Sequence, residues 1–209
     1  MFNKKIIKIM ILFIFISAFN SPPLYQKHAR EFLLEEKVDD SVIAKLTGRK
    51  NLSKSELQEL SGFDNISVLH LLAASPSITE EIYNNLSHMN KSDIDLGLAS
   101  NNKLSLDRII AFREKGKYST INGYIATNSA VPSEILLEMY KNKEALNVNF
   151  AINPNCPAGI MEDIYNKGNE IDKAWLATNP NLPLDLFKKL LNSESQIIAN
   201  YAKRNSQYK

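Results

Sequence analysis

Cysteine and glycine are scarce in this chain, and each shortage excludes a class of structure or chemistry. The single cysteine, Cys156, cannot form an intramolecular disulfide, so packing alone has to stabilise the fold. The seven glycines form neither a GxGxxG pattern nor GxxxxGK followed by Ser or Thr, which excludes the usual phosphate-binding loops. With only eight prolines as well, the composition argues against a fibrous or long disordered chain.

Catalytic and metal-binding spacings are also missing. The three histidines, His28, His70 and His88, form neither a His-x3-His nor a His-Glu-x-x-His pattern. Cys156 stands where related segments have Leu, Ile or Val, which favours a small buried hydrophobic side chain over a nucleophile. His70 is interpreted as a hydrogen-bonded core residue rather than a ligand. We therefore predict a protein that is not an enzyme and that needs no cofactor or metal.

The charge of the chain is close to balanced. Its 25 basic and 23 acidic residues give a formal charge of +2, and three lysines, Lys4, Lys5 and Lys8, lie near the N-terminus. Removing these three leaves 22 basic residues against 23 acidic ones, a formal charge of about −1. A near-neutral body gives no electrostatic reason to expect nucleic acid, so the predicted partner is another protein.

The N-terminus has the pattern of an export signal. The lysines precede an apolar run of 11 residues, Ile9 to Phe19, and the segment Asn-Ser-Pro-Pro follows it. A membrane-spanning helix needs roughly 20 apolar residues, so this run is short for a permanent anchor. We predict a signal peptide over residues 1–20 and a periplasmic or secreted protein. The alternative is an uncleaved anchor in the inner membrane, which would be the only membrane contact, with the domain facing the periplasm.

A segment of eight residues recurs along the chain. Residues 176–183 are LATNPNLP and residues 150–157 are FAINPNCP, with fainter copies at 46–53, 72–79, 98–105 and 125–132, and a partial copy at 201–206. The second residue of each copy is small, and successive copies are 25 to 27 residues apart: Thr47, Ala73, Ala99, Ala126, Ala151, Ala177 and Ala202. This period predicts a repeat domain over residues 42–209, preceded by a linker and capping helix over 21–41.

Each repeat is predicted to be a helical hairpin. The first helix has an apolar core position five residues before the small residue: Val42, Val68, Ile94, Ile121, Leu146 and Ile197. In the sixth repeat that position is Asp172, and the neighbouring Ile171 is predicted to take its place in the core. An asparagine two residues after the small residue is expected to end that helix in the left-handed conformation: Asn101, Asn128, Asn153 and Asn179. The second helix is expected to begin at a cap or proline position: Ser53, Thr79, Ser105, Pro132, Pro157 and Pro183.

A hairpin of this size cannot bury both of its apolar faces, so neighbouring hairpins have to stack. The predicted fold is therefore all-α, a right-handed α-solenoid of about six to seven hairpins of 25–27 residues. The Ala-x-Asn-Pro-Asn-x-Pro motif resembles the leucine-rich repeat variant, a bacterial relative of HEAT-like repeats, over about residues 38–205. That resemblance implies a curved helical superhelix with a binding role. It assigns no catalytic or metal-binding residue, because the N-terminal cysteine cluster of a founding member is missing here.

One repeat position changes character at every step and is a candidate contact surface. It lies two residues before the small residue and contains, in order, Lys45, Leu71, Gly97, Tyr124, Asn149, Trp175 and Asn200. We predict that Leu71, Tyr124, Asn149 and Trp175 are exposed and bind a partner, with the two aromatic residues as anchors. The alternative is that they fill packing gaps between adjacent helices.

Arg108 is a second candidate contact residue, because it interrupts a column of apolar residues. Related repeats have Ile82, Ile135, Ile160 and Leu186 there. A slip in register that turns Ile109 inward and Arg108 outward is favoured over a buried charge.

Three functional hypotheses follow. The leading one is an exported protein-binding scaffold, in a concrete form a periplasmic immunity protein that neutralises a delivered toxin. The second is an envelope assembly or adaptor protein with several partners. The third, ranked lowest, is an envelope hydrolase whose acidic and histidine residues are assembled between repeats.

Overall fold

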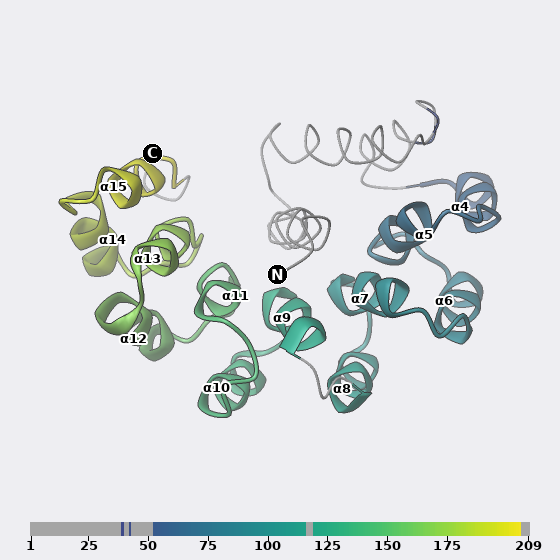
Figure 1. Ribbon diagram of the computed structural model, residues 1–209, viewed down its shortest axis with the longest axis horizontal. Helices are drawn as coiled ribbons and strands as arrows, with labels where there is room; N and C mark the ends of the chain where they lie inside the picture. The colour runs from purple at the N-terminus through teal and green to yellow at the C-terminus, as the bar shows by residue number, and fades with distance from the viewer. Residues whose placement is uncertain (1–38, 40–41, 43–51, 116–118, 206–209) are drawn as a thin grey trace, which may run out of the picture. The chain divides into compact units, whose positions relative to one another are not determined.

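The computed structural model describes residues 39, 42, 52–115 and 119–205, and all regular structure in these ranges is α-helical (Figure 1). The predicted all-α class is therefore confirmed for the described residues. No helix among them is long and apolar enough to span a membrane. The predicted signal peptide (1–20), all but Asp39 of the linker and cap (21–41), and the first repeat position, Thr47, lie outside the described residues.

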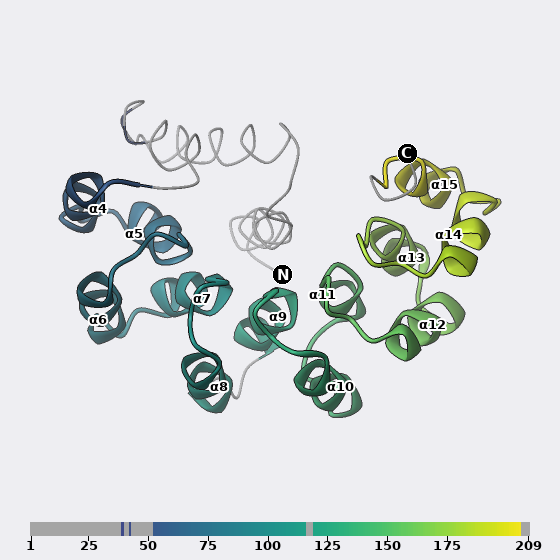
Figure 2. The same cartoon turned by 180° about the vertical axis from the view of Figure 1, so that it is seen from behind.

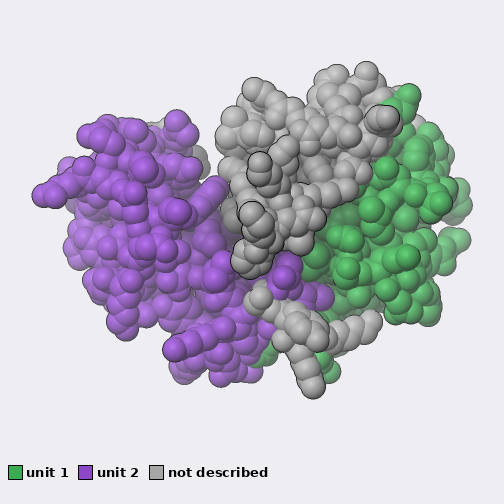
Figure 3. All heavy atoms as spheres, in the orientation of Figure 1, with its two compact units in different colours: residues 1–117 green, residues 118–209 purple. Residues whose placement is uncertain are grey.

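The chain divides into two compact units, residues 1–117 and 118–209 (Figure 3). In unit 1, α5 and α7 pack side by side, and α4 and α6 form a second row that continues to α8 (Figures 1 and 2). The bounds of these helices are α4 Lys54–Ser61, α5 Ile66–Ala73, α6 Glu80–His88, α7 Ser92–Ser100 and α8 Leu106–Lys115.

Unit 2 has the same two-row arrangement within itself. The first row contains α9, α11, α13 and α15, each packed on the next, and the second row contains α10, α12 and α14 (Figure 2). The bounds are α9 Ser119–Thr127, α10 Ser133–Lys141, α11 Asn147–Ala151, α12 Ala158–Lys167, α13 Glu170–Leu176, α14 Leu184–Leu191 and α15 Gln196–Ala202. In each unit the core lies between its own rows.

The predicted starts of the second helices are confirmed where caps are described. The Ser53 hydroxyl accepts a hydrogen bond from the Glu56 N–H, and the Thr79 hydroxyl accepts one from the Ile82 N–H. Proline occupies the N-cap of the three later second helices, α10, α12 and α14. A proline is tolerated there because the first turn of a helix has no intrahelical acceptors for its N–H groups.

The repeated asparagines bind the preceding hairpin. Asn101, Asn153, Asn179 and Asn205, here named the asparagine ladder, are all buried. Each side-chain amide donates to two backbone carbonyl oxygens lying 25 to 28 residues earlier, at 2.7 to 3.0 Å. The acceptor carbonyls belong to the end of the preceding first-row helix and the turn after it.

This arrangement corrects the prediction that the asparagines adopt the left-handed conformation. Among the described non-glycine residues only Asn90 and Lys143 have a positive φ, and Asn101 has a φ of −71°. The side chain explains the recurrence instead. In Asn101, Asn153 and Asn179 the side-chain oxygen accepts a hydrogen bond from the backbone N–H two residues later, for example from the N–H of Asn181 to Asn179 at 2.8 Å. All polar atoms of the buried amide are thereby satisfied.

The second asparagine of the Asn-Pro-Asn motif extends the same contact. The amide of Asn155 donates to the carbonyls of Ser129 and Val131 at 2.9 and 3.0 Å, and that of Asn181 donates to the Pro154 carbonyl at 2.8 Å. Both asparagines of the motif therefore join a turn to the previous turn.

The ladder also corrects the register of the last repeat. Asn205 makes the same pair of bonds to Ala177 and Asn179 that Asn179 makes to Ala151 and Asn153. The counterpart of Ala177 is therefore Lys203, which is also the C-cap of α15, and the predicted assignment to Ala202 is one residue too early.

For several residues of the first-row helices, the prediction that they lie in the core is wrong. Ile171, Leu146 and Ile197 are exposed, whereas Asp172 is buried. Asp172 is the third residue of α13, and its carboxylate accepts hydrogen bonds from the Asn169 N–H and from the Asn147 amide. Capping the helix start thus determines which side chain points inward, and the neighbouring isoleucine is turned to the surface.

Candidate binding surfaces

The predicted contact column is only partly exposed. Leu71 on α5, Tyr124 on α9 and Asn149 on α11 are all buried, so the expected exposure of these three is wrong. Asn149 shows the reason most clearly: its side-chain oxygen accepts the Leu146 N–H at 3.0 Å, and its amide group packs against Gly123. Their part in binding a partner remains a prediction.

Trp175 differs from the rest of the column. It is half-buried, and its ring makes an edge-to-face contact with Tyr201 of α15, with centroids 5.6 Å apart and an interplanar angle of 71°. In the corrected register Tyr201 is the counterpart of Trp175. Sequence reasoning missed Tyr201 because it placed Asn200 in the column, and the signal that would have found it is Asn205, 26 residues after Asn179.

Two exposed isoleucines extend this aromatic contact into a patch. Ile171 and Ile197 precede Trp175 and Tyr201 by four residues, which places each pair on one face of its helix. Their side chains are 64% and 51% exposed. We name Ile171, Trp175, Ile197 and Tyr201 the α13–α15 patch, since those helices pack side by side.

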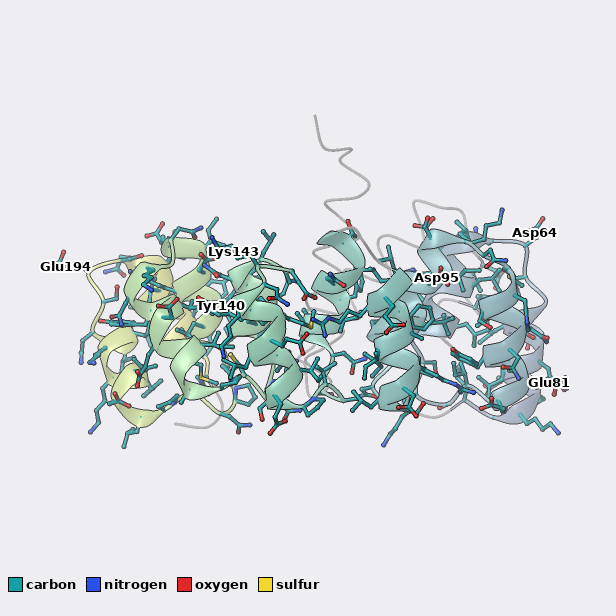
Figure 4. All side chains as sticks on the ribbon, turned by 90° about the horizontal axis from the view of Figure 1, so that it is seen from below. Asp64, Glu81, Asp95, Tyr140, Lys143 and Glu194 are labelled. Atoms are coloured by element: carbon teal, nitrogen blue, oxygen red, sulfur yellow. The ribbon has the colours of Figure 1, made fainter. Side chains whose placement is uncertain are left out.

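Charges of opposite sign flank the patch. Glu170 and Glu194 are exposed near the starts of α13 and α15, and Lys203 and Arg204 are exposed at the end of α15. Glu194, in the turn before α15, lies at an edge of unit 2 (Figure 4). The α13–α15 patch therefore has an acidic end and a basic end, in the order that helix dipoles favour.

Arg108 lies on the surface of unit 1, as the predicted slip in register requires. Ile109 is buried, and the Arg108 side chain is half-buried. Its guanidinium carbon lies 3.9 Å from the centroid of the Tyr83 ring, and its two terminal nitrogens bind the two carboxylate oxygens of Glu80. The hydrogen bond to Arg108 lowers the pKa of the Glu80 carboxyl, and burial raises the pKa of the Tyr83 hydroxyl.

A pocket of about 250 Å³ opens beside this arginine, between α6 and α8. The buried residue Phe112 lines the pocket together with Arg108 and Tyr83. The remaining lining residues are Ser87, His88, Asn90 and Ala111. Sequence reasoning singled out Arg108 but not this pocket, because its lining comes from two helices of different hairpins.

A tyrosine–carboxylate pair joins α10 and α12. Tyr140, labelled in Figure 4, donates its hydroxyl to Asp163 at 2.7 Å, and Lys167 forms an ion pair with the same carboxylate. Burial, together with the bond to Asp163, raises the pKa of Tyr140 to about 12. Lys167 and Tyr140 both bind Asp163 and lower the pKa of its carboxyl, and the Tyr140–Asp163 bond links two successive hairpins.

Cys156 and His70 are both in the core, as predicted. Burial raises the pKa of the Cys156 thiol to about 12, which removes the thiolate that nucleophilic chemistry needs. His70 lies on α5, and its Nδ1 is hydrogen-bonded to the carbonyl oxygen of Asp93. Within residues 52–115 and 119–205, no group of three or more His, Cys, Asp or Glu side chains could hold a metal ion.

Acid is expected to destabilise the fold through His70. Burial lowers its pKa from 6.5 to about 4, so between these pH values the unfolded chain binds a proton that the folded chain does not. Above pH 6.5 the free energy of unfolding therefore does not depend on the titration of His70. As pH falls from 6.5 towards 4, the free energy of unfolding decreases by about 3 kcal/mol in total. Urea unfolding between pH 7 and pH 4 measures the effect. His70→Gln should flatten this dependence relative to wild type, and His88→Gln is the control for replacing an exposed histidine. Equal slopes in wild type and His70→Gln would contradict the assignment.

The chain matches none of the family models, curated proteins or solved structures with which it was compared. The similarity to leucine-rich repeat variants therefore stays a prediction from the motif.

Proposed function

We propose that this chain is a non-enzymatic protein-binding scaffold of the cell envelope, built as an α-solenoid of the leucine-rich repeat variant type. The recurring asparagine bonds within each unit support stacking of the hairpins. Export rests on the N-terminal pattern alone. A dedicated partner, such as a toxin neutralised by an immunity protein, is the specific form of the proposal, and an adaptor with several partners is its alternative.

The α13–α15 patch is the observation that carries the binding role. Two isoleucines more than half exposed lie beside a tryptophan and a tyrosine that touch each other across adjacent helices. Single exposed apolar residues are common on proteins, but a contiguous group with aromatic members is typical of an interface centre.

The charges around the patch define the kind of partner. A complementary surface carries apolar side chains opposite the isoleucines, a basic group opposite Glu170 and Glu194, and an acidic group opposite Lys203 and Arg204. Such an arrangement fixes the direction in which the partner lies along α13 and α15 and makes association dependent on salt.

The test is affinity capture by the full chain from extracts of its own cells and of competing cells, with the captured proteins identified by mass spectrometry. The variants Ile171→Asp and Ile197→Asp place a charge in the α13–α15 patch. Leu184→Asp is the matched control, because Leu184 is 52% exposed on α14, outside the patch. Circular dichroism first establishes that all three variants fold.

One protein captured in near-equal amount, lost with both patch variants and retained with Leu184→Asp, is the expected result. For that partner we expect at least a tenfold increase in Kd with each patch variant, because each buries a charge without a counter-ion. Many weak partners would favour the adaptor. Capture that is unchanged by both patch variants would overturn the assignment of the surface.

A further inference from the structure

The pocket between α6 and α8 is a separate feature of unit 1. Its volume of about 250 Å³ is below the range of about 300–1,000 Å³ typical of sites that enclose a whole small-molecule ligand. A space of this size suits one large side chain. Pockets that receive a single anchoring side chain of a partner are a common element of protein interfaces.

The lining favours an aromatic occupant. Phe112 and Arg108 both line the pocket, and an aromatic ring packs well against another ring or against a guanidinium plane. Arg108 is held in place from one side by the Tyr83 ring at 3.9 Å and at its nitrogens by Glu80, so its orientation is already fixed.

The same ion pair disfavours an anionic occupant. Both terminal nitrogens of Arg108 bind the Glu80 carboxylate, so a phosphate or a carboxylate would have to bind beside a group of like charge that already neutralises the arginine. An aromatic ring needs only the guanidinium plane and leaves the ion pair intact.

His88 adds a hydrogen-bond acceptor to the lining. Its Nδ1 lies 2.7 Å from the Asn84 carbonyl oxygen, which can only accept, so Nδ1 carries the proton. In the neutral ring Nε2 is then an acceptor, which suits the hydroxyl of a tyrosine or the N–H of a tryptophan.

We propose that the pocket lined by Tyr83, His88, Arg108 and Phe112 is a binding site for an aromatic side chain, tyrosine or tryptophan, of a polypeptide partner. The proposal does not depend on the α13–α15 patch, which belongs to unit 2 and is tested with different variants.

The experiment is titration of the isotope-labelled full chain with N-acetyltyrosine amide, followed by amide NMR. N-acetylleucine amide is the apolar control, and inorganic phosphate is the anionic control. Saturable shifts of the amides of residues 87–90 and 108–112, with a Kd at least fivefold lower for the tyrosine compound than for the leucine compound, are expected. No saturable shift is expected with phosphate.

Two variants locate the site. Ala111→Phe places a ring at the pocket from an exposed position on α8, and Ala158→Phe makes the same change at an exposed position on α12. We expect Ala111→Phe to weaken binding at least fivefold and Ala158→Phe to leave it unchanged. Arg108→Leu should also weaken it. Equal affinity for the tyrosine and leucine compounds, saturable phosphate binding at the same amides, or unchanged binding in Ala111→Phe would each overturn the proposal.

Discussion

Replacing Asn179 with alanine is expected to lower the free energy of unfolding by about 2–4 kcal/mol, one of the two largest effects in this chain. The wild-type amide donates to the carbonyls of Ala151 and Asn153 at 2.7 and 2.8 Å, and its oxygen accepts the Asn181 N–H. The residue is fully buried, so water cannot replace these bonds without opening the contact between hairpins. Urea unfolding followed by circular dichroism at neutral pH measures the loss.

Two further variants identify which bonds matter. Asn179→Asp keeps the shape and the acceptor but cannot donate, so it should cost as much as alanine or more, because a charge is buried as well. Asn181→Ala removes only the bond to the Pro154 carbonyl from an exposed residue and should cost about 1 kcal/mol or less. If Asn179→Ala proved no more harmful than Asn181→Ala, the ladder would not be a main source of stability.

Gly97→Ala is the second substitution expected to have a large effect. A Cβ at Gly97 would lie 2.4 Å from the His70 carbonyl oxygen and 2.9 Å from the Ala73 Cβ, so α5 and α7 would have to separate. No described glycine has a positive φ, so the cost is steric rather than a matter of backbone conformation. We expect a loss of about 2–3 kcal/mol in the same unfolding measurement.

The matched control is the same change at Gly159. That glycine lies in the first turn of α12, and an added Cβ would meet nothing within 4 Å. Alanine has the higher helix propensity, so Gly159→Ala should raise stability by up to about 1 kcal/mol. Losses of similar size at both sites would show that the close approach of α5 and α7 is not what Gly97 provides.

The sequence predicted the features that repeat locally. The period, the all-helical class, the caps at Ser53 and Thr79 and the inward turn of Ile109 follow from spacing and residue type. Spacing could not show what the repeated asparagine does, because its hydrogen-bond partners lie in the previous hairpin. Recurrence identifies a position, and only the structure identifies the groups that it binds.

The candidate surface was harder to predict for a related reason. Variation along a repeat column reflects the packing of neighbours as much as contact with a partner, as Asn149 shows by packing on Gly123. Hydrophobicity predicts a core position for Ile171, but the capping bond of Asp172 sets the rotation of α13 and turns the isoleucine outward. Local polar bonds at helix starts therefore decide which residues form the surface.

The asparagine ladder also gives the chain a direction of assembly. Each amide follows its acceptor carbonyls by 25 to 28 residues, so the acceptors are always synthesised first. At a translation rate of about 5–20 residues per second, each acceptor pair precedes its asparagine by about one to six seconds. Within each unit, a hairpin emerging from the ribosome can dock at once on one that is already complete. Loss of the last hairpin would leave the acceptor carbonyls of the hairpin before it exposed to water, which can solvate them. Loss of an earlier hairpin would leave the asparagine amide of the next hairpin without its acceptors.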